Sequence, residues 1–214
     1  MRLHDYASSG NCYKVRLALA QLGVPYERVP VDIFNGGTLT DEFGRLNPAR
    51  TTPVLETGAG EVLVESNAIL VYLGEGSELI PEDPVERARV LRWLFYEQAE
   101  IVPGIGTPRV RVAAGLLDPG GPSAERALAG GRAALGVVEG HLRDRDFLVG
   151  ERYTLADLCV YAYVHVAGEA GLDLADYPVI NAWIERVEAT PGHVDDLTPI
   201  PPDTRFGKGL SIYG

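Results

Sequence analysis

The apolar positions of residues 1–75 change several times between the spacing of a strand and the spacing of a helix. Residues 2–6 predict a short strand. The apolar residues that follow recur every three or four positions, which predicts one buried stripe of a helix formed by Cys12, Val15, Leu19 and Leu22. Gly23 stands where the end of a helix favours glycine. The chain is therefore expected to begin with a strand and a helix.

The same stretch continues with a second strand, a short helix and a meander. Apolar residues alternate at Val29, Val31 and Ile33. Thr40 precedes two acidic residues, as at the beginning of a helix. Residues 54–56 and 62–64 flank a compact turn, and Ser66 can cap a helix that runs to about Leu73. The predicted order is β-α-β-α-β-β-α, with an antiparallel pair of strands before the last helix.

The rest of the chain is helical wherever it is periodic. Residues 76–84 predict a linker between the first domain and a helical domain, residues 85–214. Pro84 suits the first position of a helix. Pro103 and Pro108 are expected to kink or break that helix, because each removes a backbone donor.

Three later helices have clear boundaries. Ser123 is expected to cap a helix whose buried face is formed by Leu128, Leu135, Val138 and Leu142. Thr154 and Asp157 have the spacing of a capping box. Pro178 begins the last predicted helix, which ends before Pro191.

Composition excludes several classes of function. A net charge of −11 argues against a protein that binds nucleic-acid backbones, which needs a basic face. No apolar run has membrane-spanning length, and the N-terminus lacks the apolar core of a signal peptide. The two cysteines, Cys12 and Cys159, are too few for a disulfide scaffold and lack metal-ligand spacing. We therefore expect a cytoplasmic protein with no metal and no membrane or nucleic-acid partner.

Four short segments carry a family resemblance. They are Ser-Ser-Gly-Asn-Cys at residues 8–12, Asn-Pro-Ala-Arg-Thr-Thr-Pro-Val-Leu at 47–55, Glu-Ser-Asn-Ala-Ile at 65–69 and Thr-Leu-Ala-Asp at 154–157. In this order and spacing the chain resembles the cytosolic glutathione S-transferases, and residues 9–16 resemble the bacterial members with a serine-type active site. The resemblance covers roughly residues 1–192. It implies an α/β thioredoxin-like N-terminal domain, then an all-α helical domain, and a homodimer.

Ser9 is the first candidate catalytic residue. In the thioredoxin fold, the loop after the first strand presents a side chain at a helix N-terminus, where partial positive charge favours a thiolate. Redox members carry Cys-x-x-Cys there, whereas this chain has Ser9-Gly10-Asn11-Cys12. A serine cannot form a mixed disulfide, but its hydroxyl can donate to a bound thiolate and so favour the ionised sulfur. The resemblance also implies a contact from Asn11 to the sulfur.

Two alternatives remain open at this loop. One is that Ser8 or Ser9 merely caps the helix. Cys12 can be a reactive thiol in the first helical turn, although its place on the apolar stripe favours a buried structural cysteine.

The resemblance implies further contacts with glutathione. Pro53 is expected to follow a cis peptide bond, with the Thr52 backbone facing the cysteinyl part of the tripeptide. Ser66 and the helix N-terminus suit the γ-glutamyl carboxylate, and Glu65 suits its ammonium group. Arg50 stands one position before the family's usual cation, so its contact with the glycyl carboxylate is open. The alternative for Pro53 is an ordinary trans proline at a strand edge. The alternative for Ser66 is a plain N-cap.

The electrophile pocket is expected to be lined by Gly10, Ile101, Gly104 and Arg109. Arg109 either reaches glutathione or an anionic substrate, or forms a salt bridge that is solvated or lies at an interface. Residues 206–213 either cover the pocket or form a disordered tail. The expected function is a transferase that delivers the glutathione thiolate to a small hydrophobic electrophile. Alternatives are a glutathione-dependent isomerase, dehalogenase or disulfide reductase, and a non-enzymatic carrier.

Overall fold

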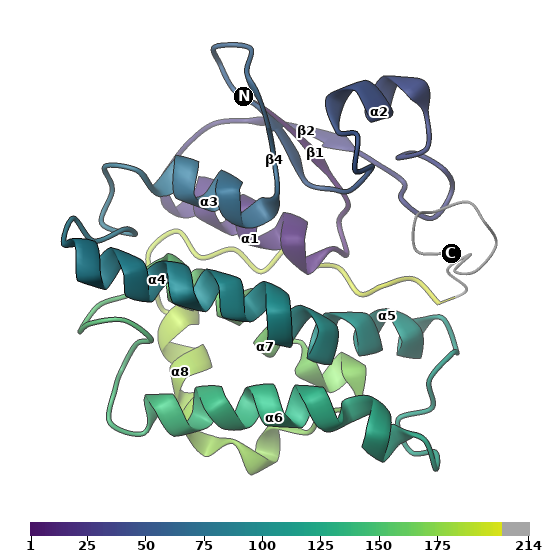
Figure 1. Ribbon diagram of the computed structural model, residues 1–214, viewed down its shortest axis with the longest axis vertical. Helices are drawn as coiled ribbons and strands as arrows, with labels where there is room; N and C mark the ends of the chain where they lie inside the picture. The colour runs from purple at the N-terminus through teal and green to yellow at the C-terminus, as the bar shows by residue number, and fades with distance from the viewer. Residues whose placement is uncertain (203–214) are drawn as a thin grey trace.

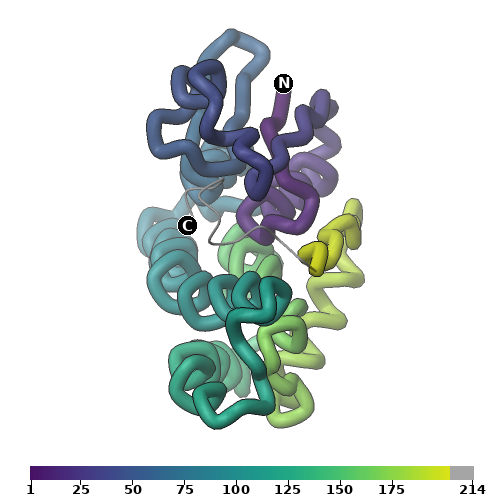
Figure 2. Tube along the Cα trace, turned by 90° about the vertical axis from the view of Figure 1, so that its right-hand side faces the viewer, coloured from purple at the N-terminus to yellow at the C-terminus, as the bar shows by residue number. Residues whose placement is uncertain are grey.

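The computed structural model describes residues 1–202. A small sheet domain lies above a larger layer of helices (Figure 1). The side view shows that the last described residues run back beside the first domain (Figure 2). The predicted cover at residues 206–213 lies outside the described residues. The predicted thioredoxin-like domain followed by a helical domain is confirmed.

The first domain contains one mixed sheet. Its strands are β1 (Arg2–Asp5), β2 (Glu27–Pro30), β3 (Val54–Glu56) and β4 (Val62–Val64). Their spatial order is β2-β1-β3-β4; β1 and β2 are parallel, and the other two pairs are antiparallel. The prediction that Val31 and Ile33 continue the second strand is wrong. Both residues follow Pro30 and pack in a separate apolar cluster with Phe34 and Phe43.

Three helices accompany this sheet: α1 (Gly10–Gln21), α2 (Asp41–Leu46) and α3 (Ser66–Gly74). α1 and α3 lie between the sheet and the helical domain (Figure 1). Thr40 caps α2 as predicted, since its side chain accepts a hydrogen bond from the backbone N–H of Phe43. The predicted cap of α3 is wrong by one position. Glu65 occupies the N-cap with a φ of 66°, and Ser66 is the first helical residue.

The helical domain begins with a long rod. It consists of α4 (Pro84–Tyr96), the π-helix η1 (Glu97–Gly106) and α5 (Thr107–Ala113). Figure 1 shows that α4 and α5 follow one another along one line. The α-helix that begins at Pro84 ends at Tyr96, so the predicted break takes the form of a change to a π-helix, and Pro108 is the second residue of α5. Pro103 lies inside the π-helix, whose wider turn gives the pyrrolidine ring room against the preceding turn.

The remaining helices are α6 (Ala124–Leu142), α7 (Leu155–Val164), η2 (Ala167–Ala170), η3 (Leu174–Asp176) and α8 (Pro178–Glu188). The predicted buried face of α6 is confirmed. Ser123 holds the N-cap position of α6, but its side chain makes no capping hydrogen bond. No helix within residues 1–202 is long and apolar enough to cross a membrane.

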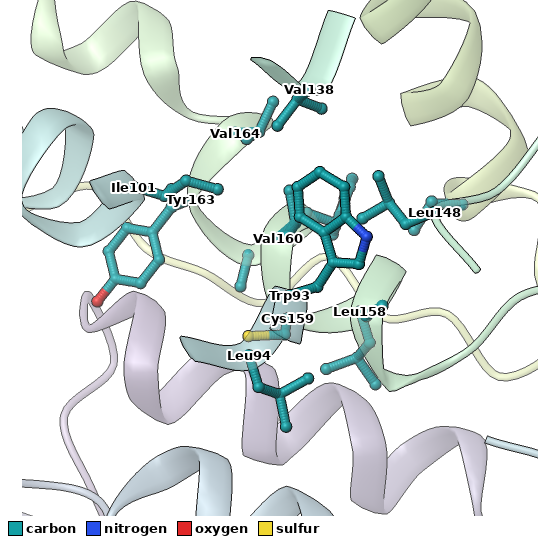
Figure 3. Close-up of a cluster of buried hydrophobic side chains, with 14 of the residues drawn as sticks. Trp93, Leu94, Ile101, Val138, Leu148, Leu158, Cys159, Val160, Tyr163 and Val164 are labelled. Atoms are coloured by element: carbon teal, nitrogen blue, oxygen red, sulfur yellow. The ribbon is translucent and has the colours of Figure 1, made fainter. Parts of the chain in front are cut away.

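α7 is the centre of the core. All ten of its residues are buried, and Figure 3 shows Leu158 and Val160 of this helix near Trp93 of α4. The predicted capping box is confirmed. Asp157 also accepts hydrogen bonds from the backbone N–H of Leu148 at 2.8 Å and from the indole N–H of Trp183 at 3.0 Å. Burial raises the pKa of Asp157 to about 6. This carboxyl group therefore joins the start of α7 to α8.

Candidate functional site

Ser9 lies between β1 and α1. It is the N-cap of α1, and its Oγ accepts a hydrogen bond from the backbone N–H of Cys12 at 3.3 Å. Ser9 therefore caps α1. A serine hydroxyl has two lone pairs and one proton, so accepting one bond leaves its proton able to be donated elsewhere. Capping and donation to a ligand are compatible roles for the same side chain.

A cavity of about 180 Å³ opens beside Ser9, between the first domain and the rod. Ser9 and Asn11 contribute polar groups to it, while Phe34, Val102 and Val110 contribute apolar surface. Gly10 and Arg109, both predicted at the pocket, also line it. The site therefore combines a polar helix N-terminus with an apolar wall.

The prediction that Ile101 and Gly104 line the electrophile pocket is wrong. Ile101 is fully buried in the main core. Gly104 faces α6, where a Cβ atom would come within 2.7 Å of the backbone nitrogen of Gly131. Neither residue lines the cavity; Val102 and Gly106 of η1 do. The prediction came from the positions that line the pocket in the family. A π-helix turns less per residue than an α-helix, so the residues that face the cavity depend on where the π-helix lies.

Tyr163 of α7 is a pocket residue that the sequence analysis did not identify. A Cβ atom on either Gly10 or Gly106 would come within 2.7 Å of its Cε1 atom. Figure 3 shows the Tyr163 hydroxyl pointing toward the beginning of the purple helix α1. Two glycines, one from each domain, thus leave the space that this ring fills. The sequence gives little signal for it, because Tyr163 is one of two tyrosines in a largely apolar helix.

Asn11 connects the two domains at the polar end of the cavity. Its Oδ1 accepts from the Ser66 hydroxyl at 3.2 Å and from Nε2 of Gln98 at 3.1 Å. Because Oδ1 makes both bonds, the NH₂ group is the part of this side chain that can donate to a ligand. Ser66 is buried at the start of α3, and Glu65 beside it is exposed.

The other predicted glutathione contacts lie in the same domain. The peptide bond between Thr52 and Pro53 is cis, as expected. Arg50 donates from Nη1 to the carbonyl oxygens of Thr38 at 3.0 Å and Thr40 at 2.9 Å. Its guanidinium group therefore holds the segment before α2.

A buried ion pair lies behind Asn11, and it too was not foreseen. Nζ of Lys14 is 3.0 Å from both carboxylate oxygens of Glu97, and both side chains are fully buried. The amide of Asn67 donates to Glu97 at 3.1 Å, and the thiol of Cys159 donates to Asn67 at 3.3 Å. This network links α1 and α3 of the first domain to η1 and α7 of the second.

The two cysteines are structural in their surroundings. Both are fully buried and free. Burial raises the pKa of Cys12 to about 11 and raises that of Cys159 well above its usual value. A buried thiol with a raised pKa is a poor nucleophile, so the rival reading of Cys12 loses support. Residues 1–202 also hold no group of three or more His, Cys, Asp or Glu side chains that could bind a metal.

Arg109 is buried and makes bonds in three directions. Nε is 2.7 Å from the Glu169 carboxylate, Nη1 is 2.7 Å from the Ser8 carbonyl oxygen, and Nη2 is 3.3 Å from the Thr198 carbonyl oxygen. Arg109 thus forms a salt bridge within the helical domain, and its other two bonds reach residue 8 and residue 198.

Comparison with known families agrees with the resemblance seen in the sequence. Residues 8–75 match the family described as Glutathione S-transferase, N-terminal domain, and residues 93–191 match Glutathione S-transferase, C-terminal domain. A solved glutathione S-transferase structure from Pseudomonas fluorescens shares 43% identity, with a TM-score of 0.85 over 92% of this chain and 98% of that chain.

Curated relatives carry different activities in their names. The maleylacetoacetate isomerase of Rhizobium meliloti is 35% identical over 86% of this chain and 89% of its own length. The disulfide-bond oxidoreductase YfcG of Escherichia coli is 30% identical over 87% of this chain and 89% of its own length. With both of its domains matched, this chain is a member of the glutathione S-transferase family.

Proposed function

We propose that the protein is a glutathione transferase in which Ser9 stabilises the thiolate of bound glutathione. The observation that carries the proposal is the position of the Ser9 hydroxyl. It caps α1, keeps a proton to donate, and lies at the polar end of an apolar cavity. A sulfur bound there meets a hydroxyl donor and the positive end of a helix, and both favour the ionised form.

The rest of the tripeptide lies along the first domain in this proposal. The first N–H groups of α3, at Ser66, bind the γ-glutamyl carboxylate, and the exposed Glu65 binds the ammonium group. Thr52 bonds to the cysteinyl backbone, and Asn11 donates its amide to the sulfur. The protein has a net charge of −11, so helix N-termini must supply the positive potential that an anionic ligand needs.

The cavity suits a small hydrophobic electrophile. Its volume of about 180 Å³ is below that of typical pockets for drug-sized ligands. Phe34, Val102 and Val110 give it an apolar wall, and Tyr163 fills its inner side. Because Arg109 already bonds to three protein groups, the cavity has no spare cation for an anionic substrate among these residues.

A glutathione-dependent isomerase is the second candidate, supported by the similarity to maleylacetoacetate isomerase. Both reactions need the same activated thiolate, which in isomerisation adds to the substrate and leaves again. Reduction of disulfides by bound glutathione is a third use of that thiolate. Assays of the three reaction classes with one enzyme preparation distinguish them.

The test of the proposal is Ser9→Ala, with Ser9→Thr as the variant that keeps the hydroxyl. Removing one preorganised donor from a stabilised anion is expected to lower kcat by ~10²–10³-fold. Glutathione affinity should change less, because the tripeptide keeps its other contacts. Thiolate absorbance of the bound tripeptide against pH should show a higher thiol pKa in the alanine variant.

Two results would refute the proposal. One is calorimetry that detects no binding of glutathione to the wild-type protein. The other is an alanine variant with wild-type kcat and an unchanged thiol pKa.

A further inference from the structure

We propose that Arg109 and residues 194–200, here called the C-terminal strap, are positioning elements for Ser9. They hold residues 7–9 in the geometry in which the Ser9 hydroxyl addresses the glutathione sulfur. The inference rests on the proposed role of Ser9 and adds to it the groups that fix its direction.

The strap is bound to α1 by buried groups. The Tyr13 hydroxyl donates to the carbonyl oxygen of Val194 at 2.8 Å. Arg16, which is 1% exposed, donates from Nε to both carboxylate oxygens of Asp196 at 2.9 Å. The same guanidinium donates to the carbonyl oxygen of Ala7 at 3.1 Å. Arg16 thus links the strap to the first residue of the segment 7–9.

The strap also bonds directly to residues 7–9. The Thr198 N–H donates to the Ala7 carbonyl oxygen at 3.4 Å. The Ser8 Oγ lies 2.9 Å from the Thr198 hydroxyl and 2.9 Å from the Pro199 carbonyl oxygen. Adjacent serines therefore have different roles. The Ser8 hydroxyl bonds to the strap, which leaves Ser9 as the serine whose hydroxyl proton can be donated to a ligand.

Arg109 joins these contacts from the other domain. Its bond to the Ser8 carbonyl oxygen, at 2.7 Å, fixes the peptide plane that leads into Ser9. Its bond to Thr198 fixes the strap, and its bond to Glu169 anchors the guanidinium in the helical domain. The guanidinium is a planar fork with donors in fixed directions, so a lysine cannot reproduce three divergent bonds.

The strap further forms part of the cavity. Ile200 lines it, together with Ser8 and Ser9. A strap that leaves its place would therefore release the loop and open the cavity to water at the same time. Both changes weaken the stabilisation of a thiolate, because preorganised donors are most effective where water is excluded.

The experiment uses Arg109→Lys and Ser8→Ala in the full chain. Arg109→Lys keeps the positive charge, and Ser8→Ala changes no charge, so a common effect is not electrostatic loss. Arg111→Gln is the matched control, since Arg111 is an exposed arginine on the same helix. The readouts are kcat, KM for glutathione, the thiol pKa of bound glutathione from thiolate absorbance, and Tm.

Both variants are expected to raise the thiol pKa toward that of free glutathione. They should lower kcat by ~10–100-fold, the scale of a catalytic group displaced by about 1 Å, with little change in KM. Arg111→Gln should match wild type in all four readouts. Should Arg109→Lys fail to fold, Ser8→Ala alone decides the question.

Wild-type kcat and thiol pKa in a folded Ser8→Ala protein would overturn the inference, even if Tm falls, because the strap would then be only structural. That outcome leaves the role of Ser9 intact. A wild-type protein that does not lower the thiol pKa of glutathione would instead overturn the proposed function, and the inference with it.

Discussion

At the scale of single residues, Gly106 shows how one missing side chain shapes the pocket. A Cβ atom there would come within 2.7 Å of the Tyr163 ring. We expect Gly106→Ala to displace this ring toward the cavity and to lower kcat/KM most for the bulkiest electrophiles. Gly136→Ala is the control, because Gly136 lies in α6 with open space around it and gains ~0.5–1 kcal/mol of stability from the better helix former.

Kinetics with a series of electrophiles of increasing size, alongside urea unfolding, measures both variants. Equal kcat/KM for every electrophile in Gly106→Ala and wild type would show that Tyr163 does not limit the cavity.

Some site residues could be predicted from the sequence, and others could not. Ser9 was identifiable because a serine stands where the thioredoxin fold presents its reactive group. Ile101 was placed wrongly because its position was taken from the family resemblance, and the sequence does not show that the segment forms a π-helix in which Ile101 faces the core. Tyr163 was missed because a tyrosine on a buried helix has no spacing that separates it from core residues.

At the scale of elements, the hydrogen-bond network around the buried pair of Lys14 and Glu97 joins four helices of both domains. Lys14→Met should leave the Glu97 carboxylate buried without its counterion, at a cost of ~3–5 kcal/mol in the free energy of unfolding. The double variant Lys14→Met with Glu97→Gln should recover most of this loss, since a neutral amide still bonds to Asn67. Urea unfolding of the three proteins gives the comparison.

If the single variant is as stable as wild type, the pair contributes little to joining the domains. If the double variant is as unstable as the single one, the loss comes from packing of the lysine stem and not from an unpaired charge.

The order of elements was the most predictable feature, because alternation and 3.6-residue spacing depend on local sequence. The end of the second strand was less so. Val31 and Ile33 keep the alternation, yet the ladder stops at Pro30, and the two side chains join Phe34 in a separate cluster. Alternation reports which side chains are buried, but it does not report whether the backbone has a partner strand.

At the scale of the whole molecule, two exposed aromatic residues suggest where a second copy would bind. Phe95 on α4 is 74% exposed, and Tyr72 on α3 is 47% exposed. We propose that this surface forms the interface of a homodimer, because burying exposed aromatic side chains favours association. The wild-type protein should then have twice the 23.1 kDa mass of the chain in solution.

Phe95→Asp should shift the protein toward the monomer, measured by sedimentation velocity over a range of concentrations. Leu116→Asp is the control, since Leu116 is 52% exposed in the loop after α5. A wild-type monomer at all concentrations, or equal dissociation in both variants, would contradict this interface.

The bonds between the C-terminal strap and residues 7–9 also set an order of events during synthesis. The thioredoxin-like domain is translated first and can fold as the chain emerges, since domains generally fold as units. In our proposal, the Ser9 hydroxyl is oriented only after residues 194–200 have left the ribosome and bound to residues 7–9. The thioredoxin-like domain of a newly synthesised chain would therefore be folded before its active site is complete.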